Sequence, residues 1–154
     1  MSDEQFLTIP SIPGEVKDDR HPGSIEVLNW SWLVSHASSG APGGGGGAGK
    51  AQLSDIMVVL RFDSATPLLF DACARGKRFG EALLSVRRQG MIGDYLTLRL
   101  RDAVVTTVST THSGDDPVVQ ISLGFASVTM THQIPQPDGS LGDPVSVTFG
   151  EQQV

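Results

Sequence analysis

The run from Gly44 to Lys50 has the spacing of a phosphate-binding loop, G-x-x-x-x-G-K. In such a loop backbone amides hold the phosphates, and a Ser or Thr after the lysine binds Mg²⁺. Ala51 occupies that next position, so the hydroxyl is missing. Residues 51–62 also have the composition of a strand, whereas a phosphate loop must lead into a helix. We therefore expect neither a nucleotide nor any other cofactor at this segment.

Metal ligands are not indicated, because the histidines stand singly and lack the close pairing of zinc ligands. We expect solvated loop residues at His21, His36, His112 and His132. Asp115 and Asp116 lie in a turn sequence without the ligand spacing of an EF-hand loop. The sequence predicts no metal site.

Nucleophilic catalysis is not indicated either. No G-x-S-x-G motif is present to place a serine at a nucleophile elbow. The only cysteine, Cys73, falls on the apolar side of a predicted helix, where a small core residue is expected rather than an activated thiolate. We expect a protein that is not an enzyme.

Length, net charge and the distribution of apolar residues restrict the classes of partner that the chain could bind. The 154 residues suit a single domain, residues 1–154, and the net charge of −6 disfavours binding to a phosphate backbone. No apolar run approaches the ~20 residues that span a bilayer. The first 15 residues include Asp3 and Glu4 and lack the apolar core of a signal peptide. We expect no nucleic-acid partner, no membrane insertion and, if the protein is exported, a route other than general secretion.

Alternation of apolar and polar residues is the dominant pattern, and it predicts strands at residues 82–86, 95–101, 119–125 and 145–149. The phase of the alternation changes after Phe125, which suggests a β-bulge near Ala126 or Ser127. Residues 64–76 instead have helical spacing, with Ser64 as the expected N-cap and Gly76 as the expected stop. These elements predict a mainly all-β fold, a closed barrel or two packed antiparallel sheets of about eight strands, with one short flanking helix.

A longer strand is predicted at residues 25–34. Alternation places Leu28, Trp30, Trp32 and Val34 on one face, which we expect to lie in the core, and Asn29 and Ser31 on the opposite face. The Gly-rich segment that follows, residues 36–50, is too long for a tight hairpin and predicts an extended loop.

Several segments, in order and at matching spacing, resemble the Hcp family of bacterial type VI secretion. The similarity covers nearly the whole chain, and its clearest segments are residues 12–15 (IPGE), 25–32 (IEVLNWSW), 65–67 (ATP), 84–87 (LSVR), 120–123 (QISL) and 138–142 (DGSLG).

The resemblance implies a β-barrel with a flanking helix that assembles as a hexameric ring. Such rings stack into the inner tube of a contractile apparatus, inside sheath proteins and behind a VgrG-type spike, and carry small effector proteins in the lumen. The protein would be made in the bacterial cytoplasm and secreted through the type VI apparatus without a cleavable signal peptide.

The resemblance also suggests where assembly residues lie. The polar face of the strand at residues 25–34 would line the lumen, with Asn29 and Ser31 facing cargo. The Gly-rich loop would reach an adjacent subunit through Gly43, Gly44, Gly45, Gly46, Gly47, Gly49 and Lys50. Two alternatives share this β-rich pattern: a tube protein of a related phage-like contractile particle, and a monomeric β-sandwich binding module with Trp30 or Trp32 exposed.

Overall fold

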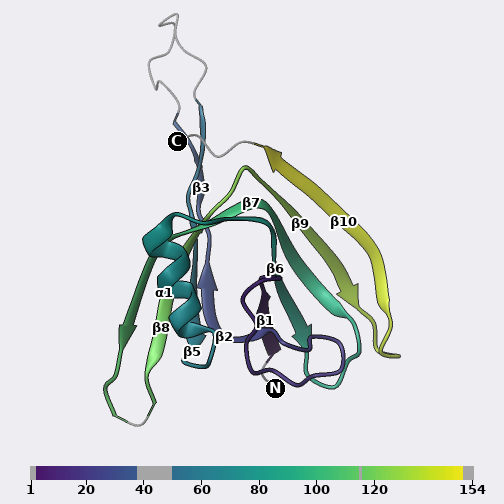
Figure 1. Ribbon diagram of the computed structural model, residues 1–154. Helices are drawn as coiled ribbons and strands as arrows, with labels where there is room; N and C mark the ends of the chain where they lie inside the picture. Colours follow the sequence, from purple (N-terminus) through teal and green to yellow (C-terminus); the bar gives the residue numbers. More distant parts are fainter. Residues whose placement is uncertain (1–2, 38–49, 115, 151–154) are drawn as a thin grey trace, which may run out of the picture.

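The structure consists of a β-barrel and a projecting sheet that share one long strand, β7 (Asp94–Thr111) (Figure 1). The computed structural model describes residues 3–37, 50–114 and 116–150. These residues form the strands β1 (Asp3–Thr8), β2 (Ile25–Ser31), β3 (Val34–His36), β4 (Ala51–Leu53), β5 (Ile56–Arg61), β6 (Arg78–Arg88), β7 (Asp94–Thr111), β8 (Val118–Gly124), β9 (Ser127–Pro135) and β10 (Leu141–Gly150), and the helix α1 (Thr66–Arg75).

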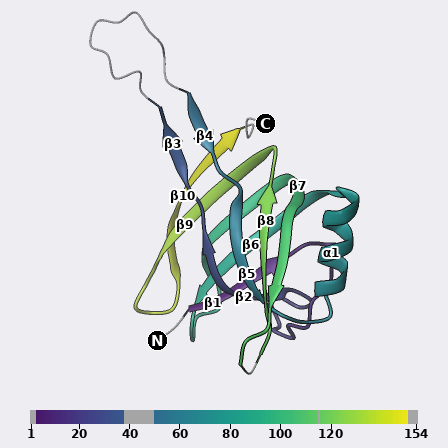
Figure 2. The ribbon, with the colours of Figure 1, turned by 90° about the vertical axis from the view of Figure 1, so that its left-hand side faces the viewer.

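Six strands close the barrel. Their order is β7-β6-β1-β2-β5-β8, and β8 pairs again with β7. Strands β9 and β10 extend the sheet from the other half of β7, while β3 and β4 form a separate two-stranded ribbon that projects from the barrel (Figures 1 and 2). The predicted fold, mainly β with a closed barrel and one short helix, is confirmed.

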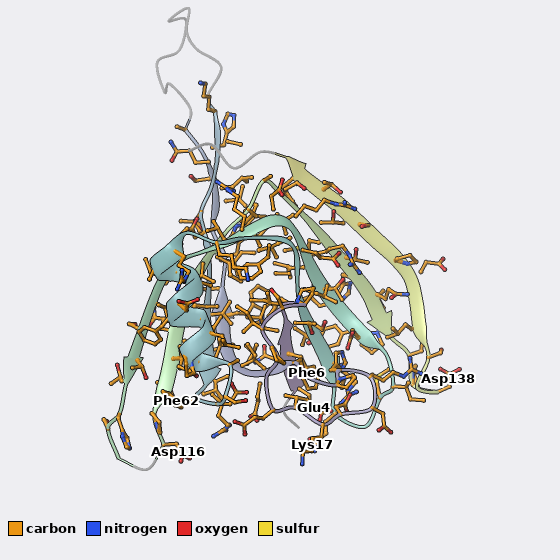
Figure 3. The ribbon with its side chains drawn as sticks, in the orientation of Figure 1. Glu4, Phe6, Lys17, Phe62, Asp116 and Asp138 are labelled. Atoms are coloured by element: carbon orange, nitrogen blue, oxygen red, sulfur yellow. The ribbon has the colours of Figure 1, made fainter. Side chains whose placement is uncertain are left out.

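The interior is filled by the alternating residues that the sequence pattern indicated. On β7, Leu98 and Leu100 are fully buried, and on β8 the same is true of Ile121 and Leu123. Full burial of each such side chain contributes about 1.5–3 kcal/mol, so this alternation fixes which side of each strand faces inward. Figure 3 shows the side chains gathered between the strands.

The predicted faces of the strand at residues 25–34 were partly wrong. The core residues at its start are Ile25 and Val27, and the pairing with β5 then shifts register between Val27 and Asn29. The extra residue, Leu28, is left 38% exposed, and Val34 is 41% exposed because the strand ends at Ser31. A one-residue bulge reverses the side of every later side chain.

The predicted bulge near Ala126 or Ser127 is not an inserted residue. Strand β8 ends at Gly124 and β9 begins at Ser127, and the registers of both with β7 agree across this point, Val104 with Gly124 and Arg101 with Ser127. The register shift lies further along β7, between Val105 and Thr107. The ladder is interrupted beside Asp102, whose φ of 52° is a left-handed conformation. The pair of strands therefore turns a corner here, and the sheet leaves the barrel.

The helix is capped one residue later than expected. Ala65 is the N-cap and makes no side-chain capping bond, so Ser64 does not cap the helix. The Asp63 carboxylate accepts a hydrogen bond from the Ala65 amide instead, at 2.8 Å. Gly76 ends the helix with a φ of 61°, as predicted. Leu69 and Ala72 join the core, which places α1 against the barrel.

Candidate assembly surfaces

The predicted lumen residues lie on a partly exposed and largely uncharged outer surface of the barrel. Asn29 and Ser31 are both exposed, on the side of β2 away from the core. Cross-strand pairing continues their rows over β5, β8 and the second half of β7. We call this wall the four-strand face; its residues are Asn29, Ser31, Met57, Val59, Thr107, Ser109, Gln120 and Ser122.

The four-strand face presents hydroxyl, amide and apolar groups in alternation. Thr107 Oγ1 and Ser122 Oγ lie 2.5 Å apart, so neighbouring hydroxyls satisfy one another across the strands. Charged side chains lie at the two ends of the wall. At one end Arg61 Nε lies 3.2 Å from Glu26 Oε1, and at the other Asp55 Oδ2 accepts a hydrogen bond from Thr106 Oγ1 at 2.5 Å. An alternating arrangement of this kind is wettable and offers no strong charge to a protein that contacts it.

The described residues on either side of the Gly-rich segment belong to the ribbon of β3 and β4 or adjoin it. Val34 pairs with Leu53, and His36 with Ala51, so Ala37 and Lys50 lie at the far end of the ribbon. Gly43 to Gly47 and Gly49 lie outside the described residues. Lys50 is exposed and is followed by strand β4, not by the helix that a phosphate loop requires.

The two tryptophans pack against the core at the base of this ribbon. Trp30 and Trp32 are each half-buried. The Trp32 ring meets Phe149 edge to face, with centroids 5.2 Å apart, and Phe125 at 6.1 Å. Their predicted contact with the core is confirmed, and a sugar-stacking platform, which needs free ring faces, is disfavoured.

Strands β9 and β10, with residues 96–101 of β7, form a sheet that stands away from the barrel; we call it the wing (Figure 1). One face of the wing is polar, and its hydroxyls pair across the strands: Thr129 with Thr148 and Thr131 with Ser146, each at 2.8 Å. The other face continues the barrel core outward. We call it the wing's apolar face; its outer residues are Leu96, Met130, Ile134, Val145 and Val147.

A second exposed apolar surface runs along α1. Pro67, Phe70 and Ala74 are spaced three and four residues apart, so they share one side of the helix, and all three are exposed. We call them the helix stripe. This side faces away from Leu69 and Ala72, which are buried in the barrel. The outer side of the helix also carries the exposed ion pair of Asp71 with Arg75, so it is apolar only in part.

The structure contains a buried charge network beneath residues 14–24 that the sequence pattern did not predict. Arg87 is 7% exposed, and its guanidinium donates to Glu4 and, at 2.8 and 3.0 Å, to both carboxylate oxygens of Asp18. These hydrogen bonds from Arg87 hold the pKa of Asp18 well below its usual range. The network fixes the segment onto the outer side of β1 and β6.

His21 belongs to the same network, so its expected place as a solvated loop residue was wrong. It is 7% exposed and stacks on Phe6 with centroids 4.1 Å apart. Its Nδ1 lies 3.1 Å from Asp18, and its Nε2 lies 3.0 Å from Asp94. Asp94 is 73 residues away in sequence, so no local spacing could have indicated this contact.

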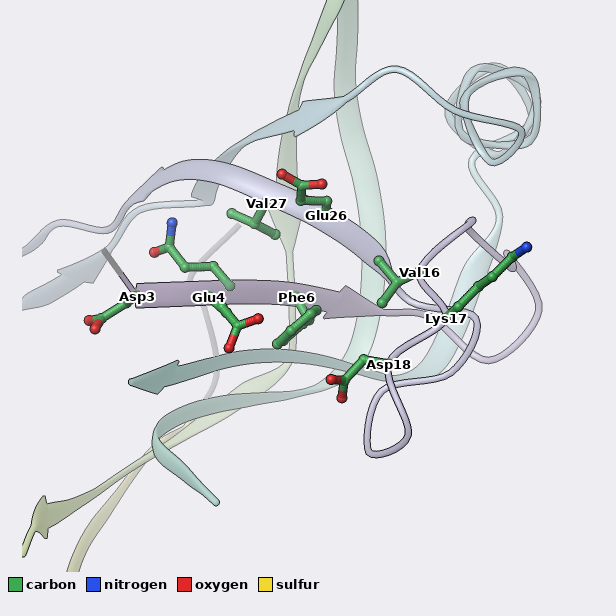
Figure 4. A pocket seen from close by; sticks show the side chains of 9 residues that line it. Asp3, Glu4, Phe6, Val16, Lys17, Asp18, Glu26 and Val27 are labelled. Atoms are coloured by element: carbon green, nitrogen blue, oxygen red, sulfur yellow. The ribbon is translucent and has the colours of Figure 1, made fainter. Parts of the chain in front are cut away.

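A pocket of about 480 Å³ opens beside this network, where β1 and β2 separate after pairing at two positions (Figure 4). Its lining includes four carboxylates, and each is held by an arginine of the chain: Asp3 by Arg88, Glu4 and Asp18 by Arg87, and Glu26 by Arg61. Because these charges are already paired, the pocket offers no free acidic site to a cation.

Other sites of chemistry are not found in the part of the chain that the structure describes. No group of three His, Cys, Asp or Glu side chains there could hold a metal ion. No described helix is both long enough and apolar enough to span a bilayer. Cys73 is half-buried and packs against the core, in line with its expected structural place.

Comparison with known proteins matches these features to one family. The model of the family described as "Type VI secretion system effector, Hcp" matches residues 6–132. The chain is 37% identical to Protein hcp1 of Pseudomonas aeruginosa, over 99% of this chain and 98% of that one.

Solved structures agree with the sequence match. Hcp1 of Salmonella typhimurium is 28% identical and superposes with a TM-score of 0.82, covering 98% of this chain and 96% of its own. A type VI secretion system effector of Yersinia pestis is 26% identical, with a TM-score of 0.77 over 95% and 98% of the two chains. The chain therefore belongs to the Hcp family and is a tube protein of the type VI secretion system.

Proposed function

We propose that six copies of the chain close into a ring and that the four-strand face forms its inner wall. The observation that carries this proposal is the wall itself: an uncharged outer surface that extends over four barrel strands, on which Asn29, Ser31, Thr107, Ser109 and Gln120 are exposed. An outer surface of a monomer is normally rich in Lys, Glu, Asp and Arg, but this one carries its charges only at the edges. A lumen repeats its wall at every subunit, so like charges would face one another across the channel.

Asn29 and Ser31 are the cargo-facing residues in this proposal. Both are small polar residues on the exposed side of β2, and neither side chain is needed to fill the core. A small effector protein would meet the same shallow contacts at each subunit of the ring. Weak contacts repeated in this way retain cargo by multivalency and still release it.

The Gly-rich loop, with Gly43, Gly44, Gly45, Gly46, Gly47, Gly49 and Lys50, is the inter-subunit arm. The ribbon of β3 and β4 supports this assignment, because it carries both ends of the loop away from the barrel (Figure 2). Exposed apolar residues at the base of the ribbon, Leu33 at 65% and Val34 at 41%, offer a neighbour a surface to cover.

Stacked rings would form the inner tube, inside a contractile sheath and behind a VgrG-type spike, and would leave the cell with the apparatus. The family match supports export through this apparatus.

Multi-angle light scattering at micromolar concentration tests the ring. We expect a species of six times the 16.3 kDa chain mass, and class averages in negative-stain microscopy with six-fold symmetry and a central opening. A single species of 16.3 kDa would contradict the proposal.

A further inference from the structure

Residues 14–24 are attached to the barrel by polar groups and not by an apolar core. The segment closes on itself through backbone hydrogen bonds, one of them from the Gly23 amide to the Val16 oxygen at 2.9 Å. Within the segment, only His21 and Ser24 are buried, and neither is aliphatic. Burial of apolar surface, the usual source of tertiary stability, therefore contributes little to holding the segment in place.

The two parts of this segment are held in different ways. Its beginning is joined to the loop before α1, where the Asp63 carboxylate accepts a hydrogen bond of 2.9 Å from the Glu15 amide. We call residues 17–22 the tip. In the described chain, the hydrogen bonds and ion pairs from the tip to the barrel run through the side chains of Asp18 and His21. The attachment of the tip therefore depends on charge.

His21 lies between two carboxylates, one at each ring nitrogen. Nδ1 is 3.1 Å from Asp18 Oδ2, and Nε2 is 3.0 Å from both Oδ1 and Oδ2 of Asp94. A neutral imidazole has one N–H group and an imidazolium has two, whereas an ionised carboxylate only accepts hydrogen bonds. Both contacts can be hydrogen bonds at once only if His21 is an imidazolium or one of the two acids carries a proton.

The geometry favours the imidazolium over a protonated acid. Hydrogen bonds from Arg87 hold the pKa of Asp18 well below its usual range, so Asp18 is a carboxylate. The equal distances from Nε2 to both oxygens of Asp94 fit an N–H donor, because the O–H group of an acid would point from one oxygen only. Asp94 Oδ1 is buried and accepts no hydrogen bond elsewhere in the part of the chain that is described, so a cation beside it offsets its desolvation.

The surrounding charges also favour a cation at His21. The charged groups of the network come from the tip and from three strands: Asp18 of the tip, Glu4 of β1, Arg87 of β6 and Asp94 of β7. Three carboxylates thus share one guanidinium, and a charged imidazole supplies a second positive group. The His21 ring is stacked on Phe6, with 10° between the ring planes, and the π electrons of an aromatic face attract a cation.

We infer that His21 carries a proton on both ring nitrogens at neutral pH and thereby clamps the tip to the barrel. Loss of one proton as the pH rises would leave a single N–H group for two carboxylates, so one bond would be lost and a lone pair would face an anion. The contribution of His21 is therefore present at the lower pH and lost at the higher one. Because Val16, Lys17 and Asp18 line the pocket between β1 and β2, release of the tip would open this pocket (Figure 4).

Solid-state nitrogen NMR tests the charge of His21 directly. The sample is the full chain with His36, His112 and His132 replaced by glutamine, which leaves His21 as the only histidine and its network unchanged, since the three replaced residues are exposed. With nitrogen-15 at the histidine ring, both nitrogens should give the signal of a protonated imidazolium at about pH 7.5, where a free histidine side chain is mostly neutral. One protonated and one bare nitrogen would overturn the inference.

Hydrogen exchange tests the clamp. At pH 7, the amides of residues 16–23 should exchange about tenfold faster in His21→Gln than in the unchanged chain, as expected when a charge-assisted hydrogen bond that limits local opening is lost. His112→Gln is the matched control, because this histidine is exposed, and it should exchange like the unchanged chain. Equal exchange in the two variants would overturn the clamp.

The pH dependence of exchange in the unchanged chain completes the test. After correction for the intrinsic effect of pH on exchange, opening of residues 16–23 should increase between pH 7 and pH 9.5. Residues 136–140, a turn closed by backbone hydrogen bonds between Gln136 and Ser140 and between Gln136 and Gly139, should show no such increase. If His21→Gln does not fold, the spectrum of the single-histidine protein decides the question, since the network is intact in that variant.

Discussion

The indole Nε1 of Trp32 donates a hydrogen bond of 2.9 Å to the backbone oxygen of Ser54. This bond joins the end of β2 to the residue just after β4, and Ser54 Oγ accepts a further bond from the Leu33 amide at 3.0 Å. The base of the β3–β4 ribbon is thus fixed by a side chain that also packs against Phe125 and Phe149. The orientation of the ribbon depends on Trp32.

Replacement of Trp32 by alanine should lower the free energy of unfolding by about 3 kcal/mol, near the lower end of the usual range for this change because the side chain is half-buried. Trp32→Phe keeps the ring contacts and loses only the hydrogen bond, so a cost of about 1 kcal/mol is expected. Urea denaturation followed by circular dichroism measures both. Equal stability of the alanine variant and the unchanged protein would show that the packing at the ribbon base is not important.

Ser31→Gln should change cargo capture and not the fold. Ser31 is exposed, so the free energy of unfolding should stay within about 0.5 kcal/mol. A larger side chain on a repeated wall position should weaken retention of small effectors in a pull-down assay. Gln52→Ser, on the ribbon, is a control that should leave capture unchanged. Unfolding of Ser31→Gln, or unaltered capture, would remove Ser31 from the lumen.

Gly14→Ala should destabilise the protein by about 1–3 kcal/mol through overpacking. A Cβ at this position would collide with the backbone oxygen of Ser24 and lie 2.8 Å from Ile25 Cγ1, and neither neighbour is free to move. Gly80→Ala on β6 is the matched control, because its Cβ would meet nothing within 4 Å. Thermal melting of the two variants compares them directly. Similar melting temperatures would mean that the segment at Gly14 adjusts easily.

Asp18→Asn should lower stability at neutral pH by about 1–3 kcal/mol, because Arg87 is buried and loses a charged partner. The pKa of Asp18 is depressed in the folded state, so its contribution is complete above the ordinary aspartate value of 3.8 and declines as the pH falls below it. The difference between the two proteins in urea denaturation should therefore shrink between pH 7 and pH 2.5.

Glu26→Gln serves as the comparison for Asp18→Asn. Glu26 pairs with Arg61 where both side chains are about half exposed, so its removal should cost roughly 0–1 kcal/mol. A pH-independent difference for Asp18→Asn, or an equal loss in both variants, would contradict the buried-network account.

Lys50→Ala should leave assembly unchanged, and neither protein should release heat when ATP and Mg²⁺ are titrated into it. The lysine is exposed and leads into a strand, so the arrangement that holds phosphates at a helix start is lacking. Micromolar, Mg²⁺-dependent binding that disappears in Lys50→Ala would overturn this expectation.

The sequence predicted those features that depend on neighbours along the chain. Alternation placed Leu98 and Ile121 in the core because one face of each strand is buried, and period two is a local property. It misplaced Leu28 because the bulge there is set by pairing with β5, which a single strand does not reveal. His21 was missed for a similar reason, since Asp94 comes from the far end of the β6–β7 turn.

The assembly surfaces were predictable only in part. Asn29 and Ser31 are exposed as the pattern indicated, although the rest of the four-strand face required the cross-strand register. The wing's apolar face could not be separated from the core in sequence, because Val147 and Val128 alternate in the same way and differ only in what lies over them. The exposure of the helix stripe was not predictable either. Alternation and helical spacing identify apolar residues, but they do not show whether other elements pack over them.

Strand β7 runs without a break from Asp94 to Thr111 and is shared by the barrel and the wing. Its covalent backbone therefore couples the two mechanically. A force applied to the wing by a neighbouring subunit is transmitted along β7 into the barrel wall, where it loads the ladders with β6 and β8 in shear, many hydrogen bonds at once. Shear loading shares the force among these bonds, whereas peeling breaks them one by one, so this geometry would strengthen a subunit of the proposed tube.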